Sequence, residues 1–426
     1  MGTSSNSNAE LNPRTTRFEF SGVIGATFLS LFLPLFTVWI NTRITPGALL
    51  QLDLVYYFNW AQSAHLWIPY LVWFVTLALL DVVLPGKWML GTKLRNGKQL
   101  SYKINGIANS ALLLLVLATR WQLTSGQMPE LQFLYRHNTE IAVITILFSL
   151  YLATFCYIKS FIPGTLLALG GNSGNVVYDW FIGRELNPRL CGGLFDIKLF
   201  CELRPGMLLW FLVNLSCLHH NYLVVHGGAH VNDALLLITL MQSFYVFDGV
   251  LNEEGLLTMM DIVTDGFGFM LAFGDLTFVP FTYSLQARYL STCTRDTGAS
   301  KLAGIVLLMA VGYYIFHSAN KQKSDFRQGK LTQMKSIATA RGTKLLCDGW
   351  WSKSQHINYL GDWLISLSWC LTTGFETPLT YYYSIYFAIL LLHRQGRDEE
   401  KCQSKYGKDW DEYTRRVPYK IVPYVY

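Results

Sequence analysis

Charged and aromatic side chains are concentrated towards the C-terminal end of this 426-residue chain. Directly after an apolar segment that ends at Leu392, the tail 394–416 alternates Arg and Lys with Asp and Glu, and places Tyr406, Trp410 and Tyr413 among them. Guanidinium and ammonium groups bind phosphates, and aromatic rings offer flat faces for a nucleobase. The tail is therefore a candidate site for a phosphorylated cofactor at the edge of a membrane. The same pattern is also compatible with an amphipathic helix on anionic lipid headgroups.

A second group of cations lies in the segment 318–356, which carries eight Lys or Arg and two Asp, a local balance of +6. This excess indicates either an anion site or only the enrichment of Lys and Arg in cytosolic loops. The best match to the G-x-G-x-x-G fingerprint, at 266–271, lacks the third glycine and lies in an apolar segment. A dinucleotide would therefore be held by side chains of the basic segment and the tail.

Acidic side chains lie within or beside apolar segments between 248 and 275. Tyr245 and Asp248 share one helix face at i,i+3, and Asp261 and Asp265 are four residues apart. An ionisable group in hydrocarbon is costly, so such groups indicate function by default. We expect a proton path or a cradle for a developing positive charge. The plainer interpretation is that individual carboxylates pair with neighbouring helices.

Four histidines lie close together between 219 and 230, and His226 and His230 have a spacing that is common among metal ligands. They are not accompanied by the H-E-x-x-H pattern of zinc enzymes, and their loop falls on the face opposite the basic segment. We therefore predict a polar loop and no metal site.

Apolar helices must position all of these groups. The chain is 51% hydrophobic and only 15% charged, against about 25% charged residues in ordinary soluble domains. Lipid must therefore act as the solvent for much of its surface. The sequence predicts an all-α, polytopic integral membrane protein with about ten transmembrane helices and no Rossmann domain. The predicted spans are 21–40, 66–85, 104–119, 141–158, 206–224, 233–251, 267–290, 302–317, 358–373 and 377–393.

The distribution of Lys and Arg predicts the orientation of these spans. The two most basic loops, after the second and eighth spans, fall on the same side as both termini, which we therefore expect in the cytosol. Residues 1–20 form a polar tail, and 21–426 form one membrane domain. The C-terminal part of that domain, from about 302 to 426, is expected to form the cofactor pocket.

Two long segments, 174–189 and 391–407, resemble signatures of the sterol reductase family. Segments 265–275, 348–359 and 417–426 resemble most closely the fungal branch that saturates the C14–C15 double bond. The similarity extends over nearly all of the chain after the N-terminal tail. One departure is Lys353-Ser-Gln-His356, where many relatives read closer to Gly-x-x-Arg-His.

The resemblance implies a multi-pass endoplasmic reticulum enzyme of ergosterol synthesis. It would use NADPH to reduce a 4,4-dimethyl-8,14,24-triene sterol, entering from the bilayer, to the 8,24-diene. Membrane lipids and other enzymes of sterol synthesis are the expected partners, and nucleic acid is not. The proposed acids of the family match Tyr245 and Asp398. Its cofactor contacts match Lys323, Arg327, Leu346, Trp351, Asn358, Tyr359, Asp398, Cys402, Gln403, Ser404, Lys405, Tyr406 and Tyr413.

The expected reaction is protonation of the olefin at C15, followed by hydride transfer to the tertiary carbocation at C14. Tyr245 is the expected donor, and Asp398 orients the nicotinamide end or relays protons. Asp398 is equally acceptable as a structural partner of Arg394 or Arg397. Other hypotheses are a reductase acting at C7 or C24, an isoprenylcysteine methyltransferase, and a sterol-binding scaffold. The intact basic segment and tail disfavour the last.

Overall fold

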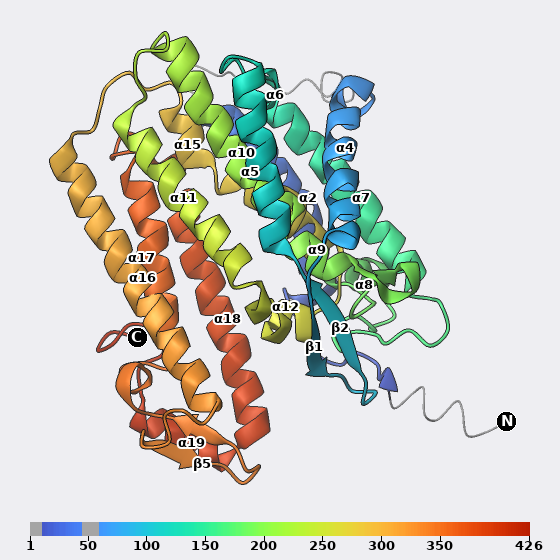
Figure 1. Cartoon of the computed structure of the whole chain (residues 1–426). Helices are drawn as coiled ribbons and strands as arrows, with labels where there is room; N and C mark the ends of the chain where they lie inside the picture. The colour runs from blue at the N-terminus through green and yellow to red at the C-terminus, as the bar shows by residue number, and fades with distance from the viewer. Residues whose placement is uncertain (1–10, 45–58) are drawn as a thin grey trace. The chain divides into compact units, whose positions relative to one another are not determined.

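The computed structural model describes residues 11–44 and 59–426, and residues 1–10 of the predicted polar tail lie outside this range. The chain divides into two compact units, Met1–Thr294 and Arg295–Tyr426, which we describe separately (Figure 1). The expectation of one membrane domain over 21–426 stays a prediction.

The first unit consists mainly of long apolar helices. A 20-residue helix is about 30 Å long, which matches the hydrocarbon core of a bilayer. Together with α16 of the second unit, seven helices of the described residues are long and apolar enough to cross a membrane. The long helices of the first unit are α2 (Gly22–Arg43), α4 (Ala64–Val83), α5 (Gly106–Leu123), α7 (Asn138–Lys159), α10 (Pro205–His220) and α11 (Asp233–Leu251). Its shorter helices include α6 (Pro129–Arg136), α8 (Val176–Ile182), α9 (Ile197–Leu203), η2 (Asn221–Val225), η3 (Glu253–Thr258) and α12 (Met260–Val263).

The span predicted at 267–290 is broken, as its glycines, Asp275 and Pro280 indicated. It consists of α13 (Phe269–Phe273), the π-helix η4 (Gly274–Phe278), α14 (Val279–Thr282) and α15 (Leu285–Leu290). Broken backbone of this kind is tolerated where protein surrounds it, and it packs against α7 and α10. Gly206 of α10 permits the approach, because a Cβ there would lie 1.7 Å from the carbonyl oxygen of Asp275.

The strands are short and all pair antiparallel. β1 (Lys87–Lys93) and β2 (Gln99–Ile104) form a hairpin between α4 and α5. The other pairs are β3 (Arg189–Leu190) with β4 (Phe195–Asp196), and β5 (Ser336–Ala338) with β6 (Lys344–Leu346). In the described part of the chain these three two-stranded sheets provide no parallel dinucleotide-binding sheet, which agrees with the predicted fold class.

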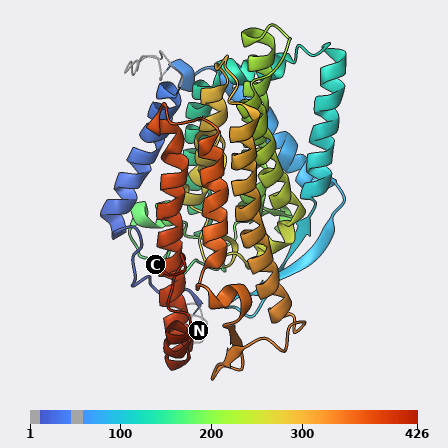
Figure 2. The ribbon, with the colours of Figure 1, turned by 90° about the vertical axis from the view of Figure 1, so that its left-hand side faces the viewer.

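Three helices of the second unit, α16 (Ala299–Arg327), α17 (Ile357–Leu371) and α18 (Tyr382–Tyr406), stand side by side (Figure 2). Glycine allows α16 and α17 to pack closely, because a Cβ at Gly361 would lie 2.7 Å from the carbonyl oxygen of Gly312. The remaining elements are η5 (Gly349–Ser352), η6 (Pro378–Tyr381) and α19 (Lys408–Arg416). Gly407, with φ +53°, separates α18 from α19 in a conformation that other residues rarely adopt.

All ten predicted spans coincide with helical segments, so the prediction of an all-α, polytopic membrane protein is confirmed. The spans differ in length for a physical reason. α17 has 15 residues and cannot cross a bilayer at right angles. α18 has 25 residues, about 37 Å, so it continues beyond the apolar part that ends at Leu392. The charged residues that follow Leu392 are thus carried on the same rigid helix.

Candidate functional site

The last turn of α16 places the predicted cofactor residue Lys323 against an aromatic ring. Its ammonium nitrogen lies 3.8 Å from the centroid of Trp351, a distance typical of a cation–π contact. Trp351 is buried, and its indole N–H donates to the carbonyl oxygen of Ala319 at 2.9 Å. This bond fixes the ring, so Lys323 has a defined position.

The electrostatic neighbours of Lys323 come from both predicted segments. They are Arg327 on α16, and Asp398 and the thiol of Cys402 on α18. Arg327 is exposed, whereas Lys323, Asp398 and Cys402 are half-buried. The second unit therefore brings the basic segment and the tail together around one partly enclosed position.

A hydrogen bond joins α17 to α18 at this position. The hydroxyl of Tyr359 donates to Oδ2 of Asp398 at 3.2 Å, and the ring of Tyr359 stacks on His356 with centroids 4.8 Å apart. Next to it, the Asn358 amide nitrogen donates to Asn320 at 3.2 Å. Oδ1 of Asn358 is buried and has no partner in the described part of the chain. A buried acceptor without a partner is costly, so Oδ1 is suited to receive an N–H group from a ligand.

Tyr413, predicted as a cofactor contact, is part of a small hydrophobic core. It packs with Ile337, Trp410 and Val417, and Cys402 and Tyr406 border the cluster. Burial raises the pKa values of the Tyr413 hydroxyl and the Cys402 thiol, so both are neutral at physiological pH. Leu346, at the end of β6, is buried as well. Tyr413 and Leu346 are therefore buried residues of the second unit.

Gln403, Ser404 and Lys405 are exposed on the last turn of α18. The side-chain amide of Gln403 donates to Asp411 of α19 at 3.1 Å, and the ammonium group of Lys405 lies 4.9 Å from the ring centroid of Tyr406. They provide polar and cationic groups at the surface end of the site.

The segment Lys353–His356, singled out only as a departure from relatives, joins the loop after η5 to the end of the chain. The backbone N–H groups of Gln355 and His356 donate to the carbonyl oxygens of Tyr419 and Lys420 at 2.9 and 2.8 Å. The Ser354 hydroxyl donates to the carbonyl oxygen of Ile421 at 2.8 Å. We call this set of bonds the terminal clamp. Because the bonded residues come from distant parts of the chain, no local sequence pattern predicts the terminal clamp.

His356 lies inside the terminal clamp and faces several charges. Burial lowers the pKa of His356 to about 4, with Asp398 and Glu399 opposing the shift and Lys323 and Lys420 adding to it. The imidazole is therefore neutral at physiological pH. Lys420 in turn donates to Glu399 at 2.7 Å, which ties the end of the chain to α18.

Tyr245, the predicted proton donor, lies on α11 of the first unit, and Asp398 lies on α18 of the second. The ring of Tyr245 is half-buried, and its centroid lies 6.1 Å from that of Trp210 at an angle of 55°. An aromatic neighbour of this kind could stabilise positive charge near the phenol.

The acidic residues between 248 and 275 have separate surroundings. Glu253 forms a buried ion pair with Arg204 at 2.6 Å, and Glu254 forms an exposed pair with Lys87 at 2.9 Å. For these two the plainer interpretation, pairing with a neighbour, is correct. Asp265 and Asp261 instead contribute, with Asp196 and Glu202, to the negative electrostatic surroundings of the fully buried Lys198.

Lys198 was missed because a single lysine at the edge of an apolar run resembles a cytosolic flank. Its ammonium group donates to the carbonyl oxygens of Ile262 and Asp265 at 2.8 and 2.7 Å. The acidic clustering in the sequence was the signal that a buried cation would be found nearby.

The histidine loop shows ring contacts. The centroids of His226 and His230 lie 3.8 Å apart, and His220 stacks on Tyr135 at 3.7 Å. In the residues that the structure describes, no three potential metal-ligating side chains gather in one place.

Comparison with known proteins identifies relatives over almost the whole length. The model of the ergosterol biosynthesis ERG4/ERG24 family matches residues 14–426. The chain is 62% identical to the Delta(14)-sterol reductase ERG24 of Saccharomyces cerevisiae, with 98% of this chain and 99% of that protein covered. It is 53% identical to the protein of the same name in Candida albicans, with the same coverage. It is also 42% identical to the Delta(14)-sterol reductase LBR of Gallus gallus, of which it covers 64%.

Proposed function

The chain belongs to the ergosterol biosynthesis ERG4/ERG24 family, and from this membership we propose that it reduces the C14–C15 double bond of sterol intermediates with NADPH. The substrate would be a 4,4-dimethyl-8,14,24-triene sterol and the product the 8,24-diene. The observation that carries the proposal is the 62% identity, over nearly the full length of both chains, to a protein named as a Delta(14)-sterol reductase.

The second unit offers groups that fit a phosphorylated dinucleotide. Lys323 and Arg327 are adjacent cations at the end of α16, and Lys405 is an exposed cation on α18. Oδ1 of Asn358, buried without a partner in the described residues, fits an amide N–H such as that of a carboxamide. Phosphates, which carry the charge, would bind the cations, and the amide end would bind near Asn358 and Tyr359. When bound, NADPH would supply the hydride.

The chain's own residues would supply the proton and stabilise the charge that develops. Protonation of an olefin at C15 leaves a tertiary carbocation at C14, and a low-dielectric site must stabilise it. Tyr245 would donate the proton from its hydroxyl, and the faces of aromatic rings that line the sterol site would stabilise the cation by up to about 2 kcal/mol each. Asp398 accepts a hydrogen bond from Tyr359, so its carboxylate would orient the cofactor end of the site.

An isotope experiment tests cofactor and position together. The purified protein would be incubated with a Δ8,14 sterol and NADPH that carries deuterium at the transferable position, and the product analysed by mass spectrometry and NMR. We expect deuterium at C14. Deuterium at another carbon, or reduction without label, would contradict the proposal. A parallel incubation with Δ7 and Δ24 sterols tests the alternative that the chain reduces C7 or C24.

Tyr245→Phe tests the proton donor. The variant should lose most turnover while it retains sterol binding and folding, because only the hydroxyl is removed. Tyr151→Phe is a matched control, since Tyr151 is an exposed tyrosine on another helix of the same unit. Full turnover in Tyr245→Phe would exclude this residue as the donor.

We further propose that the protein resides in the endoplasmic reticulum membrane with both termini in the cytosol. The Lys- and Arg-rich loops on that side support this orientation. Protease protection of epitope tags in sealed microsomes tests it, because cytosolic tags are digested without detergent.

A further inference from the structure

The β1–β2 hairpin lies where two apolar helices leave the membrane. α4 ends at Val83 and β1 begins at Lys87, while β2 ends at Ile104 and α5 begins at Gly106. Figure 1 shows both strands extending from the ends of α4 and α5. The hairpin is therefore tied to the bilayer boundary at both of its ends.

The inner face of the hairpin is packed. Met89, Leu100, Tyr102 and Ile104 contact a core that includes Leu199, Leu257 and Ile262. The alternation of a strand turns the residues between them to the opposite face. There Trp88 is 50% exposed and Leu90 is 65% exposed, opposite Lys103 and Ser101 in the register. Two large apolar side chains thus lie on a face that the first unit leaves uncovered.

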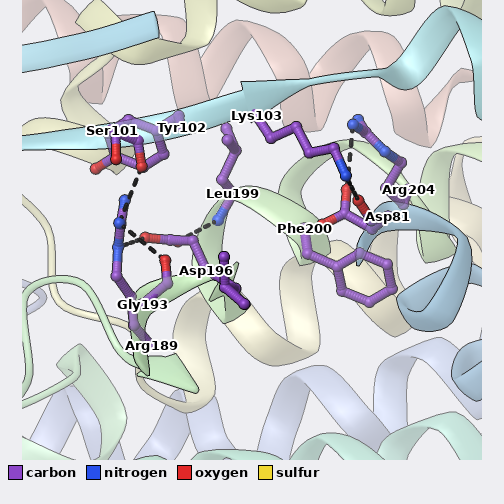
Figure 3. Close-up of a pocket in the computed structure, with 11 residues that line it drawn as sticks. Asp81, Ser101, Tyr102, Lys103, Arg189, Gly193, Asp196, Leu199, Phe200 and Arg204 are labelled. Atoms are coloured by element: carbon purple, nitrogen blue, oxygen red, sulfur yellow. Dashed lines mark hydrogen bonds and ion pairs between the residues drawn. The ribbon is translucent and has the colours of Figure 1, made fainter. Parts of the chain in front are cut away.

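Polar contacts at the base of the hairpin fix its orientation. Figure 3 shows the small pocket there. In it, Arg189 points toward the hairpin, and Lys103 of β2 points toward the end of α4. The guanidinium of Arg189 lies 4.5 Å from the ring centroid of Tyr102 and donates to the carbonyl oxygen of Ser101 at 3.0 Å. Lys103 donates to the carbonyl oxygens of Asp81 and Val82 at 3.2 and 2.6 Å. These contacts give the outer face of the hairpin a fixed orientation relative to the end of α4.

The hairpin is strongly cationic. Residues 85–105 contain five Lys or Arg and no Asp or Glu. Three of these cations have partners in the protein: Lys87 pairs with Glu254, Lys103 binds the end of α4, and Arg95 donates to the carbonyl oxygen of Leu167 at 2.5 Å. Lys93 and Lys98, at the far end of the hairpin, are exposed. The charge of this end complements an anionic surface.

The order of these residues matches the layers of a membrane surface. At about 3.3 Å per residue, Trp88 lies within roughly 17 Å of the end of α4, and Lys93 and Lys98 lie farther along the hairpin. Tryptophan is favoured at the level of the headgroups, and lysine is favoured just outside an anionic leaflet.

We propose that the outer face of the hairpin, formed by Trp88 and Leu90, docks onto anionic phospholipid headgroups together with the exposed Lys93 and Lys98 at the far end of the hairpin. The inference depends on the membrane-spanning helices on either side, and it is independent of the proposed reaction. Each exposed lysine near an anionic leaflet contributes about fivefold to association, equivalent to about 1 kcal/mol.

Lipid retention measured by native mass spectrometry tests the proposal. The full-length protein would be released from nanodiscs of phosphatidylcholine that contain phosphatidylserine as the anionic lipid. Lys93→Gln should lower the association constant for phosphatidylserine about fivefold, and Lys93→Gln/Lys98→Gln about 25-fold. Lys87→Gln is the matched control, because it removes the same charge from the same hairpin at a site paired with Glu254. It should change retention less than twofold.

Hydrogen exchange of the hairpin gives a second measurement. Amides of 87–104 should exchange more slowly in nanodiscs with phosphatidylserine than in pure phosphatidylcholine, and Trp88→Ala should reduce the difference. Equal loss of phosphatidylserine in Lys87→Gln and Lys93→Gln would overturn the proposal. Protection that depends on protein concentration and not on phosphatidylserine would also overturn it, and would assign the face to a second protein chain.

Discussion

Replacing Glu253 by Gln should destabilise the first unit much more than the same change at the adjacent Glu254. Glu253 and Arg204 are only 1% and 2% exposed, and Oε1 of Glu253 lies 2.6 Å from Nη2 of Arg204. The second carboxylate oxygen accepts the backbone N–H of Gly106, the first residue of α5, at 2.7 Å. The pair therefore connects η3, α10 and α5.

The magnitude follows from burial. Removing one member of a buried ion pair typically costs about 3 to 5 kcal/mol, because the other charge is left without compensation. Gln keeps the shape and can still accept from Gly106, and Asp81 remains 3.4 Å from Arg204. We therefore expect about 3 kcal/mol for Glu253→Gln. The Glu254–Lys87 pair is exposed at both ends, so Glu254→Gln should cost less than about 1 kcal/mol.

Thermal unfolding of the purified protein in detergent is the assay. For a unit of this size, 1 kcal/mol corresponds to roughly 2 °C, so Glu253→Gln should lower the apparent Tm by about 6 °C and Glu254→Gln by no more than about 2 °C. Equal Tm values for the two single variants would refute the reasoning.

Three further predictions concern the second unit. Arg327→Ala should raise the KM for NADPH about tenfold or more and change the KM for NADH little, because the exposed guanidinium would bind the additional phosphate of NADPH. Initial-rate kinetics with both cofactors, with Arg415→Ala as the control, check this. Equal effects on the two KM values would contradict it. Tyr359→Phe should lower kcat/KM about tenfold, since the 3.2 Å bond to Asp398 is lost and the ring can still stack on His356; unchanged kinetics would remove that role. The pKa of His356, lowered by burial to about 4 from an ordinary value near 6.5, means that the unfolded chain binds more protons between these pH values. The stability contributed by the neutral imidazole is therefore complete above about pH 6.5 and falls by about 3 kcal/mol as the pH falls toward 4. Between pH 6.5 and 4, the Tm of His356→Gln should therefore fall less than the Tm of the unchanged protein.

The membrane helices could be predicted because their signal is local. Runs of apolar residues long enough to cross a bilayer are visible in the sequence, and Pro280 and its neighbouring glycines mark the broken span. The position of Lys323 near Asp398 was also expected, because both flank apolar spans on the same predicted side. Local pattern and topology were sufficient for these features.

Other features depend on packing between distant segments. Tyr413 belongs to an aromatic tail in the sequence, yet β5 and α19 enclose it in a core. Lys198 and Arg204 flank an apolar helix as cytosolic cations would, yet both are buried. Lys198 donates to the backbone carbonyl oxygens of Ile262 and Asp265, and Arg204 pairs with Glu253, all of them more than 45 residues away in the chain. No local period identifies such partners, because charge pairing across a fold leaves no spacing rule in the sequence.

The terminal clamp affects how the protein can be made. Every residue that we propose to contact the cofactor precedes Arg416, yet the backbone hydrogen-bond partners of Gln355 and His356 are Tyr419 and Lys420. A message with a premature stop codon after position 416 would encode the complete set of contacts and still leave His356 uncovered. Folding of the second unit therefore requires residues 419–421 to be translated, and the cell's quality control would meet chains truncated before them as misfolded membrane proteins.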